Sequence, residues 1–158
     1  MTEIEQRAAI VAEALTWEGT PYHHEGRVKG REGGVDCGML IYEVYRACGL
    51  IPETEIAPYS EQFHLHRDRE DYLGYLERFG AEVNGDQARP GDAVIYKMGR
   101  CHSHAAIIIA WPKIIHATAK SGLVRTDEAT QPYFSKYERK FFSLWAKANA
   151  SADADKRS

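Results

Sequence analysis

The chain of 158 residues has little cysteine, little net charge and no long run of apolar residues. Its three cysteines, Cys37, Cys48 and Cys101, are too few for a disulfide framework, and none lies in a Cys-x-x-Cys pair typical of zinc ribbons or dithiol redox sites. The net charge of −3 gives no electrostatic basis for binding nucleic acid or an anionic membrane. No apolar stretch approaches the roughly 20 residues that cross a bilayer, so we expect no membrane span.

The first seven residues are polar and acidic, which is unlike a signal peptide. We therefore expect synthesis in the cytoplasm with reduced thiols. A role at the cell wall, or in a virion, would then need a route that uses no signal peptide.

Three segments have apolar residues at helical spacing. They are residues 4–17, Cys37–Cys48 and Asp71–Phe79. Asp36 is a good N-cap for the second helix, and Gly49 ends it. The long polar loop from His23 to Gly34 lies just before this helix, a position that is more often functional than idle.

The second half of the chain changes to the pattern of β-strands. Strands are predicted over residues 93–96, 104–110, 113–117, 122–126 and 140–145. Helices first and strands afterwards favour an α+β fold, in which helices pack on one face of an antiparallel sheet of about five strands. We expect residues 1–148 to form a single domain and residues 149–158 to be a disordered tail.

Cys37 is placed where a thiol becomes reactive. In the first turn of a helix it faces unpaired backbone N–H groups and the positive end of the helix dipole, and both favour the thiolate. A cysteine nucleophile also needs a base and a group that orients the base. His104 and His116 are twelve residues apart on adjacent antiparallel strands, so both can project from one face of the sheet. One imidazole could take the thiol proton while the other fixes its tautomer.

Four motifs in this order resemble the NlpC/P60 family of cysteine peptidases, over about residues 8 to 145. They are Trp17-Glu18-Gly19-Thr20-Pro21-Tyr22, Asp36-Cys37, Arg89-Pro90-Gly91-Asp92-Ala93-Val94, and His104-Ala105-Ala106-Ile107-Ile108 followed by Ile115-His116-Ala117. The resemblance implies a papain-like fold without a cofactor. It also implies cleavage of amide bonds in peptidoglycan stem peptides, typically between γ-D-glutamyl and a diamino acid.

The resemblance implies a role for each matched residue. Cys37 would be the nucleophile, His104 the base and His116 the third polar residue. Tyr22 would lie near the oxyanion site, and the Cys37 N–H would be a second donor there. Asp36 would cap the helix or meet a cationic substrate group.

One departure from the family pattern concerns the substrate. The family usually has Ser-Gly-Leu after the cysteine, whereas this chain has Gly38-Met39-Leu40, which puts the bond that is cleaved in question. A single compact domain with a charged loop before Asp36 is similar to the versions carried by tailed phages and gene transfer agents. That similarity implies tail or envelope assembly proteins as partners.

Other readings stay open from the sequence. The domain could be a non-catalytic plug or anchor in such an assembly, or an acyltransferase that uses the same residues. The pairs His102-Ser103-His104 and His64-Leu65-His66 could bind zinc if further ligands join them. Cys48 is expected to be a core residue, and Cys101 a loop residue flanking the site.

Overall fold

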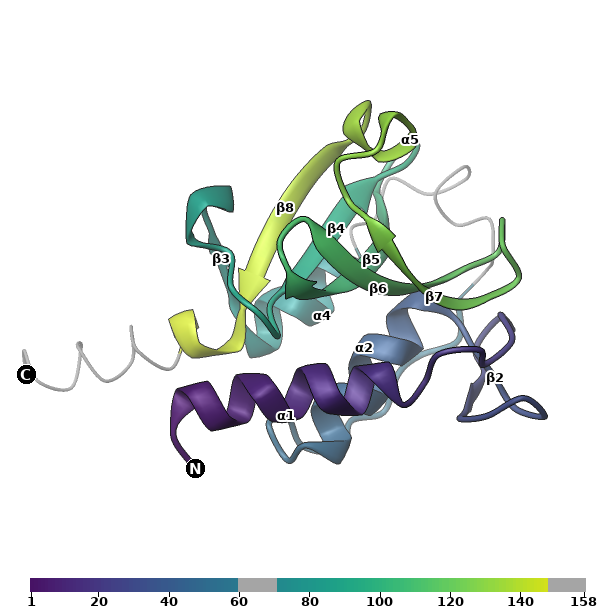
Figure 1. The fold of residues 1–158 in the computed structure, drawn as a ribbon, viewed down its shortest axis with the longest axis horizontal. Coiled ribbons are helices and arrows are strands. Elements are labelled where there is room, and N and C mark those ends of the chain that lie inside the picture. Colours follow the sequence, from purple (N-terminus) through teal and green to yellow (C-terminus); the bar gives the residue numbers. More distant parts are fainter. Residues whose placement is uncertain (60–70, 148–158) are drawn as a thin grey trace, which may run out of the picture.

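The computed structural model describes residues 1–59 and 71–147, and in the segment 71–73 only the backbone. Within these residues an antiparallel sheet of six strands lies beside two long helices (Figure 1). The helices are α1 (Glu3–Leu15), α2 (Cys37–Ala47), α4 (Asp71–Phe79) and α5 (Pro132–Ser135), with a 3-10 turn η1 (Gly85–Gln87). The strands are β1 (Arg27–Val28), β2 (Gly34–Val35), β3 (Ala81–Val83), β4 (Ala93–Lys97), β5 (His102–Ala110), β6 (Lys113–Thr118), β7 (Leu123–Glu128) and β8 (Glu138–Ser143).

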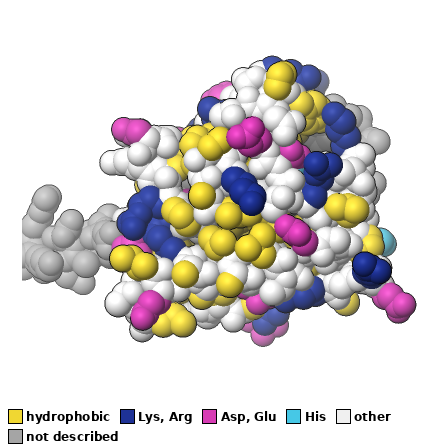
Figure 2. Space-filling model, viewed as in Figure 1, with side chains coloured by type: hydrophobic (Ala, Val, Ile, Leu, Met, Phe, Trp, Pro, Cys, Tyr) yellow, Lys and Arg dark blue, Asp and Glu magenta, His cyan; other side chains and the backbone are white. Residues whose placement is uncertain are grey.

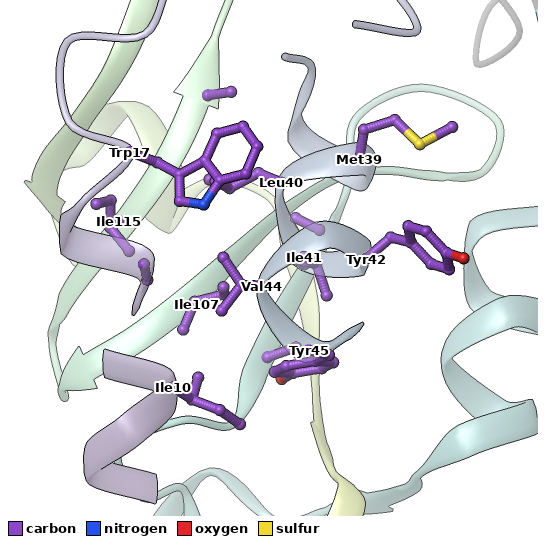
Figure 3. Packing of buried hydrophobic residues seen from close by; sticks show 14 of the residues in the cluster. Ile10, Trp17, Met39, Leu40, Ile41, Tyr42, Val44, Tyr45, Ile107 and Ile115 are labelled. Carbon is purple, nitrogen blue, oxygen red and sulfur yellow. The ribbon is translucent and has the colours of Figure 1, made fainter. Parts of the chain in front are cut away.

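The large sheet has the strand order β3-β8-β4-β5-β6-β7, and all of its pairs are antiparallel. Helices α1 and α2 pack on one face of it, where alternate strand residues such as Ile107 and Ile115 meet Leu40 and Val44 of α2 (Figure 3). The other strand residues, among them Tyr96, form a second buried cluster on the opposite face. The predicted α+β fold with helices on an antiparallel sheet is confirmed.

The two long helices begin at the caps that their sequences provide. Thr2 and Glu5 form a capping box at the start of α1, in which each side chain accepts from the other's backbone N–H. Helix α2 ends where Gly49 takes a φ of +71°, a backbone conformation that glycine adopts without steric cost.

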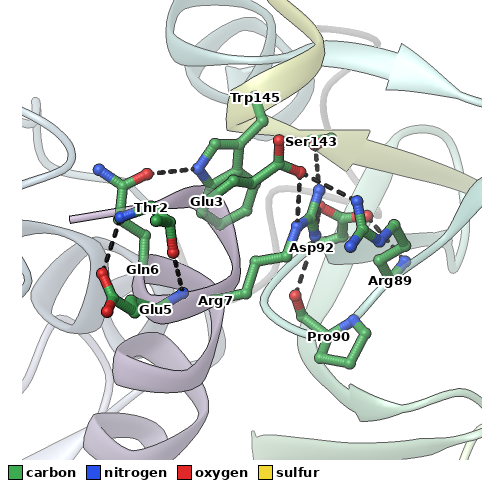
Figure 4. Close-up of polar contacts among 10 residues, drawn as sticks. All are labelled: Thr2, Glu3, Glu5, Gln6, Arg7, Arg89, Pro90, Asp92, Ser143 and Trp145. Carbon is green, nitrogen blue, oxygen red and sulfur yellow. Dashed lines mark hydrogen bonds and ion pairs between the residues drawn. The ribbon is translucent and has the colours of Figure 1, made fainter.

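A buried ion pair fastens α1 to the turn that leads into β4 (Figure 4). Arg7 Nη1 lies 2.8 Å from Asp92 Oδ1 and donates to the carbonyl O of Pro90 at 2.9 Å. The guanidinium also lies over the ring of Trp145, 4.0 Å from its centroid. Gly91 lies against Arg7 and Trp145 with a φ of +88°, a backbone conformation that favours glycine. The motif Arg89-Pro90-Gly91-Asp92 therefore has a structural role in docking helix to sheet.

Several elements differ from the sequence predictions. The polar loop from His23 to Gly34 contains the short paired strands β1 and β2, and β3 and α5 were not predicted. The last strand, β8, ends at Ser143 and residues 144–147 are helical, so the predicted strand to Trp145 was too long. The predicted tail, residues 149–158, lies outside the described residues, and the single-domain boundary stays a prediction.

The surface in the same view mixes acidic and basic side chains with hydrophobic ones between them (Figure 2). In the described part of the chain, no helix is both long enough and apolar enough to cross a membrane.

Candidate active site

Cys37 is the first residue of α2, and its position is fixed by the cap before it. Asp36 has an extended backbone, and its Oδ1 accepts a hydrogen bond from the N–H of Met39 at 2.9 Å. Cys37 is 7% exposed, and its thiol donates to the carbonyl O of Ser103 at 3.7 Å. Because Ser103 directly precedes His104, this contact brings the thiol to the backbone of the strand that carries the predicted base.

The two predicted histidines are in contact with each other. Nε2 of His104 on β5 lies 2.7 Å from Nδ1 of His116 on β6, which confirms the predicted cross-strand neighbours. Nε2 of His116 in turn lies 3.3 Å from Oδ2 of Asp127 on β7. A row of polar side chains therefore crosses the three adjacent strands β5, β6 and β7.

Aromatic rings enclose both imidazoles. The ring of Tyr96 stacks on His104 with centroids 6.2 Å apart, and Phe134 of α5 lies 6.4 Å from His104 and 5.4 Å from His116. Burial among these rings, with the neighbouring His116 adding to it, lowers the pKa of His104 to about 3. Burial also lowers the pKa of His116, although the hydrogen bond and charge of Asp127 oppose this. Near neutral pH His104 is therefore the uncharged imidazole, the form that accepts a proton.

The second oxygen of Asp36 anchors the loops around the helix start. Oδ2 accepts from the N–H of Glu25 at 2.8 Å and from the hydroxyl of Tyr59. Glu25 has a φ of +58°, and its Oε1 accepts the N–H of Tyr59 at 2.7 Å. Burial and the charge of Asp36 raise the pKa of Tyr59 well above its usual range. Asp36 thus caps the helix as predicted, while contact with a cationic substrate group stays a prediction.

A cavity of about 600 Å³ opens between α2, α4 and the sheet, next to the first turn of α2. Most of its walls are apolar side chains, and Tyr59 is among the lining residues. Gly38 and Met39 also line it. The two residues that depart from the family pattern are therefore in the wall of a pocket that adjoins Cys37.

The remaining predicted residues are placed as follows. Tyr22 is half-buried, its backbone pairs with Val35, and its N–H donates to the carbonyl O of Gly122 at 2.8 Å. Its predicted part in the oxyanion site stays a prediction. Cys48 is partly buried at the end of α2 and packs against the core, as expected, and Cys101 is fully buried.

Across residues 1–59 and 71–147, no three or more His, Cys, Asp or Glu side chains are grouped so that they could hold a metal ion. The pair His64 and His66 lies outside the described residues.

Sequence reasoning missed three residues of this site: Asp127, Phe134 and Tyr59. Asp127 lies eleven residues after His116 across the hairpin of β6 and β7, where Ile114 pairs with Asp127. The predicted strand ended one residue before Asp127, so the strand pairing that predicts the contact of the two histidines did not predict a contact between Asp127 and His116. Tyr59 lies in an irregular segment, where no spacing rule indicates a contact with Asp36.

Known proteins resemble this chain over most of its length. The model of the NlpC/P60 family matches residues 19–142. The chain is similar to the murein DD-endopeptidase MepS/murein LD-carboxypeptidase of Escherichia coli (strain K12), with 25% identity over 133 residues, covering 84% of this chain and 60% of that protein. It is 26% identical over 121 residues to the probable endopeptidase NlpC of the same organism, covering 75% of this chain and 66% of that protein. The chain thus spans about two thirds or less of the curated relatives it matches.

Solved structures share the fold. The NlpC/p60 domain of the peptidoglycan hydrolase SagA superposes with a TM-score of 0.60 at 24% identity, covering 85% of this chain and 96% of that chain. RipD of Mycobacterium tuberculosis, described as a non-catalytic NlpC/p60 domain protein adapted to peptidoglycan binding, superposes with a TM-score of 0.58 at 17% identity, covering 88% of this chain and 97% of that chain. Because the family model matches residues 19–142, most of the chain, this chain belongs to the NlpC/P60 family.

Proposed function

We propose that this protein is a cysteine peptidase that hydrolyses amide bonds in peptidoglycan stem peptides, of the γ-D-glutamyl–diamino acid type. The observation that carries the proposal is the thiol of Cys37, at a helix start, in contact with the carbonyl O of the residue directly before His104, which itself contacts His116. The similarity to murein endopeptidases supports the substrate class.

In the first half of the reaction, the thiol proton passes to His104 while the sulfur attacks the amide carbon. Because Nε2 of His104 is engaged by His116, Nδ1 is the nitrogen that takes this proton. The N–H of Cys37, in the first turn of α2 where backbone N–H groups point along the axis out of the helix, stabilises the oxyanion, with Tyr22 as the second candidate donor. His104 then gives its proton to the leaving amine, and the C–N bond breaks to leave a thioester on Cys37.

In the second half, His104 takes a proton from water, and the resulting hydroxide attacks the thioester carbon. The C–S bond breaks, the carboxylic acid leaves, and the proton on His104 returns to the sulfur. The uncharged state of His104 near neutral pH supports both roles, because each half begins with proton acceptance.

A second candidate function is binding of peptidoglycan without cleavage. The description of RipD as a non-catalytic NlpC/p60 domain favours it, as do Gly38 and Met39 in place of the usual Ser-Gly. The assignment to a phage-tail subgroup, with tail proteins as partners, stays a prediction because none of the relatives named above is described as a phage or tail protein.

The test is incubation of the protein with purified stem peptides, followed by mass spectrometry of the products. We expect cleavage by the wild type and by Cys48→Ala, a matched control at the far end of the same helix. Cys37→Ala should lose roughly four orders of magnitude or more in rate, as other nucleophile variants do. Retention of the protein on peptidoglycan with all peptides intact would instead support the binding function. A product in which an added amine replaces the leaving group would identify an acyltransferase.

A further inference from the structure

We infer that Asp127 is a positioning residue of the active site, which acts on His104 through His116. This inference rests on the proposed peptidase function. It adds a fourth member, from β7, to the three residues that the family resemblance implies.

The proton positions along the row follow from what each group can donate. A carboxylate only accepts, so the proton between His116 and Asp127 is on Nε2 of His116. The neutral ring of His116 then has a bare Nδ1, which accepts from Nε2–H of His104. Nδ1 of His104 is therefore left with a lone pair, which is what a base for the thiol of Cys37 requires.

Asp127 is itself held in one orientation. Its Oδ1 accepts from Nε2 of Gln131 at 2.5 Å and from the N–H of Glu128 at 3.2 Å. Oδ2 is the oxygen that contacts His116, and Nε of Arg125, an exposed side chain, lies 3.7 Å from it. The His116 side chain is 1% exposed and that of Asp127 is 16% exposed, so water competes little for this bond.

This arrangement makes Asp127→Asn an informative change. The two donors that face Oδ1 would hold the amide oxygen there, so the turn before α5 keeps its hydrogen bonds. The amide NH₂ would then face Nε2 of His116 and favour the opposite tautomer, with the proton on Nδ1. Nε2 of His104 would have to accept that proton, and Nδ1 of His104 would become a donor that cannot receive the thiol proton.

The experiment joins kinetics with ¹⁵N NMR of histidine-labelled protein. We expect His116 of the wild type to carry its proton on Nε2, and Asp127→Asn to move it to Nδ1. We expect kcat for stem-peptide cleavage to fall by about 10- to 100-fold, the scale for groups that orient a directly acting residue. KM should stay within about twofold, because the inferred role of Asp127 is to orient His116 and not to bind substrate. Glu128→Gln, an exposed neighbour that loses the same charge, should match the wild type in both measurements.

An unchanged tautomer or an unchanged kcat in Asp127→Asn overturns the inference. So does a wild-type His116 with its proton on Nδ1, a result that needs no variant to fold. Absence of cleavage by the wild type would count against the proposed function instead, while the NMR measurement would still test the role of Asp127.

Discussion

The buried imidazole of His104 should make the stability of the fold depend on pH. Its pKa is about 3 in the folded protein, against roughly 6.5 for a histidine in the unfolded chain. Between these values the unfolded state binds more protons than the folded state, so the free energy of unfolding falls as the pH falls below about 6.5. His116, whose pKa is also lowered, acts in the same direction.

The size of the effect follows from the slope of about 1.4 kcal/mol per pH unit for one proton. From pH 8 to pH 5, a fully realised shift of His104 alone would cost about 2 kcal/mol. Because His104 keeps some exposure to solvent, we discount this for solvent screening and expect about 1–2 kcal/mol.

The assay is urea unfolding at pH 8 and pH 5, followed by tryptophan fluorescence, for the wild type and His104→Gln. The substitution changes the free energy of unfolding at both pH values, but only the imidazole of the wild type makes the change depend on pH. We therefore expect the wild type to lose about 1–2 kcal/mol more than the variant between the two pH values. His23→Gln, at an exposed position, controls for replacing a histidine. Equal pH dependence of the wild type and His104→Gln would refute this reasoning.

Two further predictions concern contacts that hold the site's framework. Arg7→Met leaves the carboxylate of Asp92 buried without its partner, so the free energy of unfolding, measured in urea, should fall by about 3–5 kcal/mol. Arg89→Met removes an exposed ion pair and should lower it by less than about 1 kcal/mol. Equal losses for the two variants would contradict the importance given to the buried pair. Tyr59→Phe removes a hydroxyl donor to the Asp36 carboxylate and should lower the free energy of unfolding by about 1.5–3 kcal/mol in the same assay. A variant as stable as the wild type would show that this hydrogen bond contributes nothing to stability.

Features that depend on residue type and on helix or strand period could be predicted from this sequence. The cap at Asp36, the end of α2 near Gly49 and the cross-strand contact of His104 with His116 all follow from residue type and strand or helix period, and all three are present. The main strands followed from alternating and β-branched runs, which the buried faces of the sheet require.

Other features depend on tertiary contacts that no period encodes. Tyr59 meets Asp36 across 23 positions of irregular chain, and Phe134 reaches the histidines from the four-residue helix α5. Arg7 reads as one polar position of an amphipathic helix, yet it is buried against Asp92, 85 positions away. Such contacts are fixed by packing, so a single sequence indicates the residues without indicating their partners.

The proposal that Cys37 is the nucleophile is tested most directly by the mass of the protein itself during turnover. Wild-type protein mixed with stem peptide and quenched in acid should carry an added acyl group of the γ-D-glutamyl side, and peptide mapping should place it on Cys37. Cys37→Ala should carry no such group and should leave the peptide intact. Cleavage of the peptide by Cys37→Ala at the wild-type rate would contradict the proposal.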